Sequence, residues 1–360
     1  MFILRLALTL TLLSLLTTLP AQTDSLVNAQ DTTLLSAEQR SLVYDLLREL
    51  PDGAEAGLAL IEGGRTTLYG ARRQGGKLIT VENADRHFGI GSVTKVFTAT
   101  LLADLVTHGD LELDDTVNEA YGFSFLDSID ITYRQLATHT SGLPRLPNNM
   151  PGLLLNPNDP YIDYTPQMLE AYLQEGLTVA PDGDGGYSNL GFGLLGYTLG
   201  RYVDSAGYAT ALQQRVLEPL KMVDTHFGAH GISTLVTGLN LDGSPDVFWS
   251  FTEALGAAGA LVSTPRDMGR FLVAQLDSSQ TVLALARQEQ VQLNDHMAVG
   301  LGWQILRPEA GRTIHWHNGA VGGYRSFMGI DVEEQRGVVL LTNVLLTNDT
   351  VDRIGLHFLR

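Results

Sequence analysis

Near both ends of the chain, hydrophobic and polar positions alternate with the period of two that is typical of strands. In the middle they recur mainly with the spacing of helices. An amphipathic helix is expected from a capping box at Ser36 to Leu50, where Pro51 and Gly53 stop it. Three short alternating runs follow, separated by the glycine pairs of two hairpin turns. These runs predict strands at 57–61, 66–71 and 78–81.

A strongly apolar helix is predicted to begin at or near Ser92 and to end near Gly109. The pattern then changes to helices and long loops, including an irregular stretch rich in proline and asparagine at 147–160. Further helices are predicted at 166–174, 190–203, 207–217, 265–275 and 350–359, with strands at 313–317, 326–332 and 338–343.

This order of elements predicts an α+β fold. We expect one antiparallel sheet, built from both chain ends and flanked by helices, with a mainly helical domain inserted. The catalytic domain would span 36–360, with 36–110 and 251–360 forming its α/β part and 111–250 its helical part. The functional site is expected in the cleft between these layers.

Residues 1–21 have the pattern of a signal peptide, and the polar residues 22–35 that of a linker. Arg5 is the only charge, an apolar run follows at 6–16, and Ala21 suits cleavage before Gln22. The alternative is an uncleaved anchor, but the apolar run is short for a spanning helix. We therefore expect export to a periplasm or the medium, with no stable membrane anchor after cleavage.

Charge and cysteine content exclude several classes of function. The chain of 360 residues has 40 acidic and 23 basic residues, a net charge of −17. Nucleic acids and anionic membranes both require clustered basic surface, so neither is an expected partner. The chain has no cysteine, which excludes disulfides, thiol catalysis and cysteine-ligated metals.

The first candidate chemistry is the pair Ser92 and Lys95 at the start of the apolar helix. Residues three apart on a helix are neighbours, and the apolar residues around Lys95 suggest burial. Burial lowers the pKa of a lysine, so that a neutral amine can accept the serine proton. The alternative is an N-cap serine followed by a lysine that extends to water.

Two further short motifs have candidate chemistry. Tyr187 follows a glycine-rich turn and can move protons if a cation lowers its pKa, and Asn189 can bind a substrate carbonyl or the lysine. The alternative is a surface tyrosine and a helix-capping asparagine. In the second motif, His317 and Gly319 are expected to end a strand, whose edge could lend the N–H of Ala320 to an oxyanion. The alternative there is a strand end followed by a glycine turn.

The same strand offers two candidate metal ligands. His315 and His317 share one strand face, but the sequence presents no third ligand beside them, so we predict no metal and no cofactor. The His-x-Gly form is itself unspecific, because it also occurs at 226–228.

Taken together and in this order, the motifs resemble those of the serine β-lactamase and penicillin-binding-protein superfamily. The likeness is strongest to its class C-like branch, which also holds D-amino-acid peptidases and esterases. Four segments carry it: FGIGSVTK at 88–95, LATHTSGLP at 136–144, YSNLGFGLLG at 187–196 and GALVSTPRD at 259–267. The resemblance covers roughly 42–343.

The resemblance implies a role for each motif residue. Ser92 would attack an acyl carbon and form an acyl-enzyme, which water then hydrolyses. Lys95 and Tyr187 would share the proton transfers, and which of them takes the first proton stays open. Asn189 would orient the substrate amide, and the backbone N–H groups of Ser92 and Ala320 would form the oxyanion hole.

The third motif departs from the family pattern. True β-lactamases of this branch usually carry lysine where this chain has His317, and a histidine is mostly neutral near pH 7. Arg325 is a candidate replacement cation. We therefore favour a D-peptidase or esterase, with a true β-lactamase or a non-catalytic penicillin- or peptidoglycan-binding relative as alternatives. The chain lacks the Gly-x-Ser-x-Gly elbow of an α/β-hydrolase.

Overall fold

The computed structural model describes residues 34–181, 186–203, 207–308 and 311–360. The predicted signal peptide and nearly all of the predicted linker lie outside the described residues. So do the four residues 182–185 of the glycine-rich turn before Tyr187. No helix in the described part is both long enough and apolar enough to cross a membrane.

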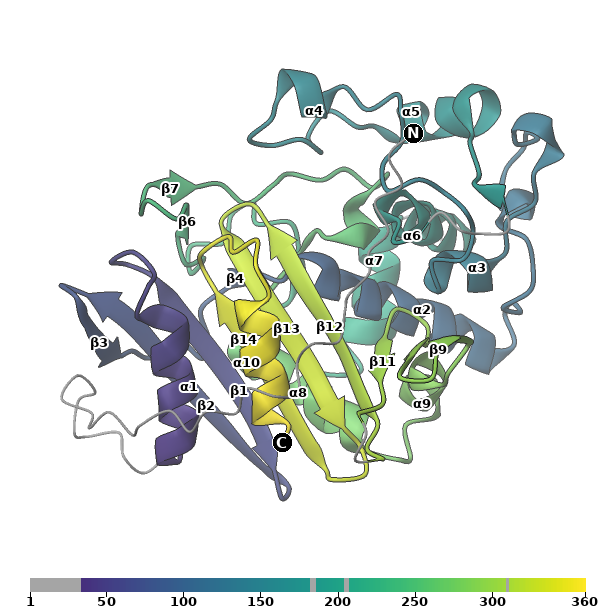
Figure 1. The fold of residues 1–360 in the computed structure, drawn as a ribbon. Coiled ribbons are helices and arrows are strands. Elements are labelled where there is room, and N and C mark those ends of the chain that lie inside the picture. The colour runs from purple at the N-terminus through teal and green to yellow at the C-terminus, as the bar shows by residue number, and fades with distance from the viewer. Residues whose placement is uncertain (1–33, 182–185, 204–206, 309–310) are drawn as a thin grey trace.

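A nine-stranded antiparallel sheet forms the centre of the molecule (Figure 1). Its order is β3-β2-β1-β14-β13-β12-β11-β10-β9, so that a strand from each end of the chain meets at the β1–β14 pair. This confirms the predicted fold class. The strands are β1 (Glu55–Glu62), β2 (Arg65–Gln74), β3 (Lys77–Thr80), β9 (Val291–Asn294), β10 (Met297–Val299), β11 (Gln304–Leu306), β12 (Ile314–Val321), β13 (Tyr324–Asp331) and β14 (Arg336–Thr342).

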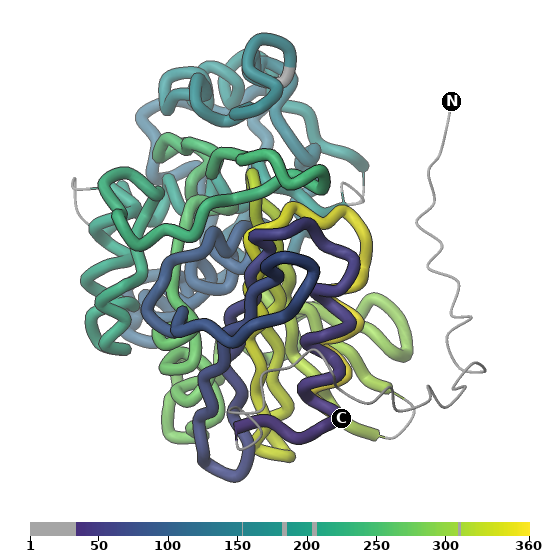
Figure 2. The backbone as a smooth tube through the Cα atoms, turned by 90° about the vertical axis from the view of Figure 1, so that its left-hand side faces the viewer, coloured from purple at the N-terminus to yellow at the C-terminus, as the bar shows by residue number. Residues whose placement is uncertain are grey.

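Each face of the sheet is covered by helices, because the central strands are apolar on both sides. Helices α1 (Ala37–Leu47) and α10 (Thr350–Phe358) lie side by side on one face (Figures 1 and 2). The predicted capping box of Ser36 and Gln39 opens α1. On the other face, α8 (Pro265–Leu276) packs against β1 and β14, and a larger core joins the sheet to the helical part.

The apolar helix after Ser92 is α2 (Thr94–His108), and nearly all of its residues are buried. It begins close to Ser92, as predicted, and Ser92 itself lies in the tight 3₁₀ turn η2 (Gly91–Val93) that precedes it. Gly109 ends α2 in the left-handed conformation, at φ 77°, as its position predicted.

The helical part contains short helices joined by long loops. The stretch 147–160, predicted to be irregular, contains one helical turn. Helix α9 and strands β9 to β11 were not predicted, because their runs are too short to show a period. The remaining elements are α3 (Tyr133–Ala137), α4 (Gly152–Leu155), α5 (Pro166–Ala171), α6 (Asn189–Val203), α7 (Tyr208–Leu212) and α9 (Thr281–Arg287), with small sheets of β4 (Phe88–Gly89), β8 (Leu261–Ser263) and β5 (His226–Phe227), and of β6 (Gly238–Leu239) and β7 (Pro245–Asp246).

Candidate active site

The turn that carries Ser92 is held between β8 and β12. The Ile90 N–H donates to Leu261 O at 3.1 Å, which continues the β4–β8 pairing up to the turn. Gly91 has φ +50°, and a Cβ on it would lie 2.6 Å from the backbone nitrogen of Ala320. Only glycine allows this approach, so the turn places Ser92 directly against the β12 backbone.

Lys95 is completely buried one turn after Ser92. Its Nζ lies 3.1 Å from Ser92 Oγ, 2.9 Å from Asn189 Oδ1 and 2.7 Å from the carbonyl oxygen of Ala258. Burial, and after it the positive charge of Arg145, hold the pKa of Lys95 well below its usual range. The lysine therefore does not extend to water, which removes the alternative of an exposed cation.

These contacts match the hydrogen-bonding capacity of a neutral amine. A carbonyl oxygen can only accept, so Asn189 Oδ1 and Ala258 O take the two N–H groups of Lys95. The third contact joins Nζ and Ser92 Oγ at 3.1 Å, and across this contact the lone pair of a neutral amine can accept the Ser92 hydroxyl proton. An ammonium in the same place would be desolvated with no carboxylate among these three contacts.

Tyr187 lies on the other side of the lysine. Its ring centroid is 4.8 Å from Lys95 Nζ and 5.3 Å from the Arg145 guanidinium. Burial nevertheless raises the pKa of Tyr187, although its hydrogen bond with Ser92 and the charge of Arg145 act in the opposite direction. The condition set from the sequence, a pKa lowered by a cation, is therefore not met, because desolvation of the phenolate outweighs the charges of Arg145 and Arg325.

Asn189 opens α6 and is fixed at both ends of its side chain. Its Oδ1 accepts from Lys95, and its Nδ2 donates to Tyr161 Oη at 3.1 Å. The Tyr161 ring in turn stacks on Phe251 at 4.6 Å and lies 5.7 Å from Trp249. Asn189 thus orients Lys95, and Tyr161, packed against two further aromatic rings, holds Asn189 in place.

Strand β12 passes the nucleophile turn at Gly319 and Ala320. The sequence placed the strand end at His317, but the strand continues to Val321 because β13 pairs with it up to that residue. A Cβ on Gly319 would lie 2.0 Å from Ile90 O, so only glycine permits the close approach. The Ala320 backbone thereby lies beside Gly91 and Ser92, where the expected oxyanion donors must meet.

His317 is buried in the site and faces the lysine side. Its Nδ1 contacts the Asn318 carbonyl oxygen at 2.6 Å, and its ring centroid is 6.3 Å from that of Tyr187. Burial, and after it the charge of Lys95, lower the pKa of His317 to about 3. Its imidazole is therefore neutral at pH 7. His315, whose pKa burial lowers to about 4, belongs with His317 to no three-residue metal cluster among the described residues.

Arg325 does not replace the missing lysine. It is paired with Ala320 across β12 and β13, so it projects from the face that carries α10. There its guanidinium binds Asp352 Oδ2 at 2.7 Å, and Asn318 Nδ2 donates to the same oxygen at 2.6 Å. Arg325 is therefore paired and not a free cation, although its charge acts to lower the pKa of Tyr187 and of His317.

Four residues of the site escaped sequence reasoning: Arg145, Tyr161, Ala258 and His139. His139 has φ 60°, its Nδ1 accepts from the Ser188 N–H at 3.1 Å, and its ring lies 4.4 Å from that of Tyr187. The dense turn motif at 138–144 was the available signal for His139 and Arg145. The other two lie in stretches whose local pattern carries no chemistry, and only the fold brings them to Lys95.

Curated relatives match most of the chain. It is 27% identical over 315 residues to the D-alanyl-D-alanine-carboxypeptidase/endopeptidase AmpH of Escherichia coli K12, covering 81% of this chain and 80% of that protein. It is also 27% identical to penicillin-binding protein 4 of Amycolatopsis lactamdurans, covering 72% of each chain.

Solved structures show the same fold. A class C β-lactamase from Rhodobacter sphaeroides has a TM-score of 0.74 at 20% identity, over 90% of this chain and 98% of that one. The octameric penicillin-binding protein homologue from Pyrococcus abyssi has a TM-score of 0.73 at 23% identity, over 89% and 75%. The β-lactamase family model matches residues 43–357. The chain therefore belongs to the β-lactamase family.

Proposed function

We propose that the protein is an exported serine hydrolase that cleaves an amide or ester through an acyl-enzyme on Ser92. One observation carries the proposal. The buried Lys95 has two carbonyl acceptors for its N–H groups, and its third contact is the Ser92 hydroxyl at 3.1 Å. This arrangement activates a serine, because a neutral amine beside the hydroxyl can take its proton.

In the acylation step, the Ser92 proton moves to Lys95 Nζ as Oγ attacks the acyl carbon. The raised pKa of Tyr187 keeps its hydroxyl protonated, so the lysine, whose pKa is lowered, is the first base. The N–H groups of Ser92 and Ala320 would bind the oxyanion, and each such donor contributes on the order of 3 kcal/mol. When the tetrahedral intermediate collapses, the leaving group receives a proton from Tyr187, which Lys95 replaces.

In deacylation, a water molecule attacks the ester carbon of the acyl-enzyme. Its proton passes to the Tyr187 and Lys95 pair, a second tetrahedral intermediate forms, and the Ser92–acyl bond breaks. Ser92 Oγ then takes the proton back from Lys95, and the free acid leaves. Asn189 keeps the lysine and the substrate amide in register throughout, since its amide is anchored on Tyr161.

We propose a D-amino-acid peptide or an ester as the substrate. The name of the E. coli relative, a D-alanyl-D-alanine carboxypeptidase/endopeptidase, supports this class. The neutral His317 supports it too, because the site lacks the permanent cation that β-lactamases of this branch place there. Arg145 remains as a positive charge beside the Tyr187 ring. β-Lactam turnover is the second candidate, and likeness to a class C β-lactamase supports the fold alone.

Export and domain division belong to the same proposal. The signal pattern at 1–21 and the polar stretch 22–35 would release a catalytic domain of residues 36–360. Its helical part, 111–250, supplies Tyr161, Tyr187 and Asn189, and its α/β part supplies Ser92 and Lys95. The substrate would then bind where the two parts meet.

The test follows the intact mass of the purified protein during incubation with a penicillin. In parallel, a chromogenic ester and a peptide ending in D-Ala-D-Ala are assayed for cleavage. We expect ester or peptide cleavage, with any penicillin adduct on Ser92. The Ser92→Ala variant should lose at least about 10⁴-fold in rate, because the nucleophile itself is removed.

The control is Ser279→Ala, a serine outside the site, which should keep the activity of the unmodified protein. Opened penicillin at many turnovers per enzyme would identify the protein as a β-lactamase. A Ser92 adduct without turnover of any ester, peptide or penicillin would instead support a non-catalytic relative. Full activity in a folded Ser92→Ala variant would overturn the proposed mechanism.

A further inference from the structure

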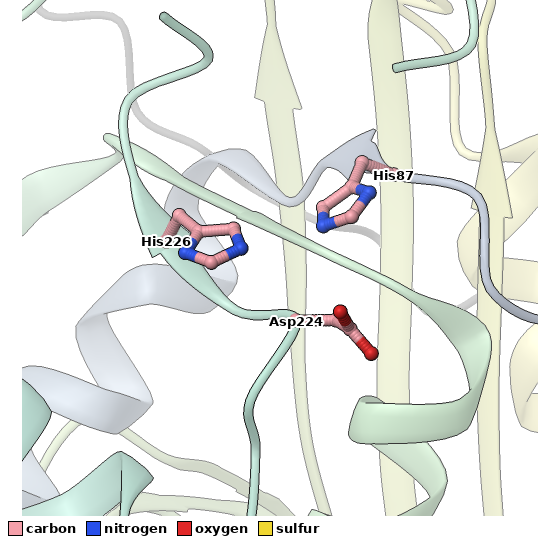
Figure 3. Close-up of side chains that lie close together, drawn as sticks. All are labelled: His87, Asp224 and His226. Atoms are coloured by element: carbon pink, nitrogen blue, oxygen red, sulfur yellow. The ribbon is translucent and has the colours of Figure 1, made fainter. Parts of the chain in front are cut away.

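Three potential metal ligands lie together in a part of the molecule that the proposed reaction does not use. His87 directly precedes β4, His226 begins β5, and Asp224 lies in the turn before β5. Strands β4 and β5 pair with opposite edges of β8, which brings the three side chains together. Figure 3 shows a nitrogen of each imidazole turned toward the space shared with the Asp224 carboxylate.

His87 has one satisfied and one unsatisfied ring nitrogen. Its side chain is only 5% exposed, and its Nδ1 lies 2.8 Å from Thr234 Oγ1. Its Nε2 is buried and has no hydrogen-bond partner within the part of the chain that the structure describes. Burial, and next the His226 ring, lower the pKa of His87 against the opposing influence of Asp224, so the imidazole is neutral at pH 7. A buried neutral nitrogen without a partner still has its capacity to bind a proton donor or a metal ion.

The turn that carries Asp224 and His226 is held in place by a residue of α8. The buried Asp267 of α8 accepts from the Asp224 N–H at 2.8 Å and from Thr225 Oγ1 at 3.1 Å. Arg270 forms an ion pair with the same carboxylate. This support holds the Asp224–His226 turn in place without using the Asp224 side chain. A ligand set with its backbone fixed in advance loses less conformational entropy when a ligand binds.

The donor set is that of a divalent transition metal. Two imidazoles and one carboxylate suit zinc, and one ligand atom from each residue lies within 4.8 Å of the other two. Zn–N bonds of about 2 Å place tetrahedral ligands roughly 3.3 Å apart. Closure therefore needs side-chain movement on the order of 1 Å, which His226 and Asp224 can make because both reach solvent.

We propose that His87, Asp224 and His226 form a zinc site that ties β4 to β5. The His87 Nε2, the Asp224 carboxylate and one His226 nitrogen would be the protein ligands, and a solvent molecule would complete the tetrahedron. Access is open, because a surface hollow of about 700 Å³ is lined by both histidines, Thr234 and His230. The site has a structural role in this proposal, since none of its three ligands belongs to the proposed catalytic set.

The test is equilibrium dialysis of the chelator-treated full chain against Zn²⁺, with metal counted by mass spectrometry. We expect one zinc per chain, and affinity at least about tenfold weaker in His226→Ala and Asp224→Asn. His230→Ala is the matched control, because His230 lines the same hollow but lies outside the cluster. It should bind zinc like the unmodified chain.

Co²⁺ provides a second readout, because a tetrahedral cobalt site absorbs visible light that hydrated cobalt does not. That absorption should appear with the unmodified chain and disappear in His226→Ala. Circular dichroism of the metal-free variants shows that they remain folded. Failure of the unmodified chain to bind zinc at 100-fold molar excess would overturn the proposal. Equal binding by His226→Ala, or equal loss in His230→Ala, would overturn it as well.

Discussion

The segment from His87 to Lys95 has a buried base at each end, and the two bases differ in how their nitrogens are satisfied. Lys95 Nζ has three oxygen partners within 3.1 Å, whereas His87 Nε2 has none among the described residues. Burial lowers the pKa of both groups and so favours the neutral form of each. Lys95, which has hydrogen-bond partners, can exchange a proton with the neighbouring hydroxyl. His87 Nε2, which has none in the described part of the chain, can instead bind a ligand.

The largest expected effect comes from removing the partnered base. Lys95→Met keeps the side-chain volume but leaves no acceptor for the Ser92 proton, so the rate of acylation should fall by about 10³-fold. Single-turnover acylation with a chromogenic ester measures it. Lys77→Met, on the exposed β3, is the control and should be unaffected. A Lys95→Met rate above one tenth of the original would contradict the role given to the lysine.

A smaller effect comes from adding charge to the lysine's partners. In Asn189→Asp, a carboxylate replaces an amide oxygen that lies 2.9 Å from Nζ, so it raises the pKa of Lys95. The base must be neutral to act. The acidic limb of the kcat/KM profile should therefore move up by about one pH unit or more. At pH values below this limb, the variant should be about tenfold slower than the unmodified chain.

The control for Asn189→Asp is Asn240→Asp, which adds the same charge at an exposed position. An acidic limb that does not move in Asn189→Asp would show that another group titrates. The Asn240→Asp profile should match that of the unmodified chain.

The role of His87 as a zinc ligand can be tested through its Nδ1, the ring nitrogen that has a partner. Thr234→Val removes the hydroxyl 2.8 Å from His87 Nδ1, and with it the hydrogen bond that orients the imidazole. Zinc affinity should fall about tenfold in dialysis, with little change in hydrolase activity. Thr210→Val, in the same hollow, should retain the full affinity. Loss of zinc in both variants would point to the hollow as a whole rather than to His87.

The smallest effect concerns His317. The unfolded chain binds a proton as pH falls below about 6.5, whereas the folded chain does so only near 3, so acid favours unfolding. His317→Gln removes the proton binding by this histidine. Between pH 7.5 and pH 5, the variant should therefore lose less free energy of unfolding than the unmodified chain, by on the order of 1–2 kcal/mol. Urea unfolding at the two pH values measures it. His296→Gln, at an exposed site, should keep the original dependence.

Local chemistry of the sequence accounts for much of the fold. The capping box at Ser36, the glycine pairs between the first strands and the apolar run after Ser92 each specify their element through nearest neighbours. The sequence could not show that Ser92 precedes the helix, or that β12 extends to Val321. Those boundaries depend on the packing of Ile90 and Gly91 against Gly319 and Ala320, which are distant from them in the sequence.

The same division applies to the two sites. Residue types and their order identified the family and the motifs, because the chemistry of serine, lysine and tyrosine is local to each side chain. The tertiary structure alone decided that Ala258 and Asn189 satisfy Lys95, that burial raises the pKa of Tyr187, and that Asp352 engages Arg325. It alone also brought His87 to His226. Protonation and ligand binding depend on desolvation and on neighbours a few ångströms away, and only the folded chain determines both.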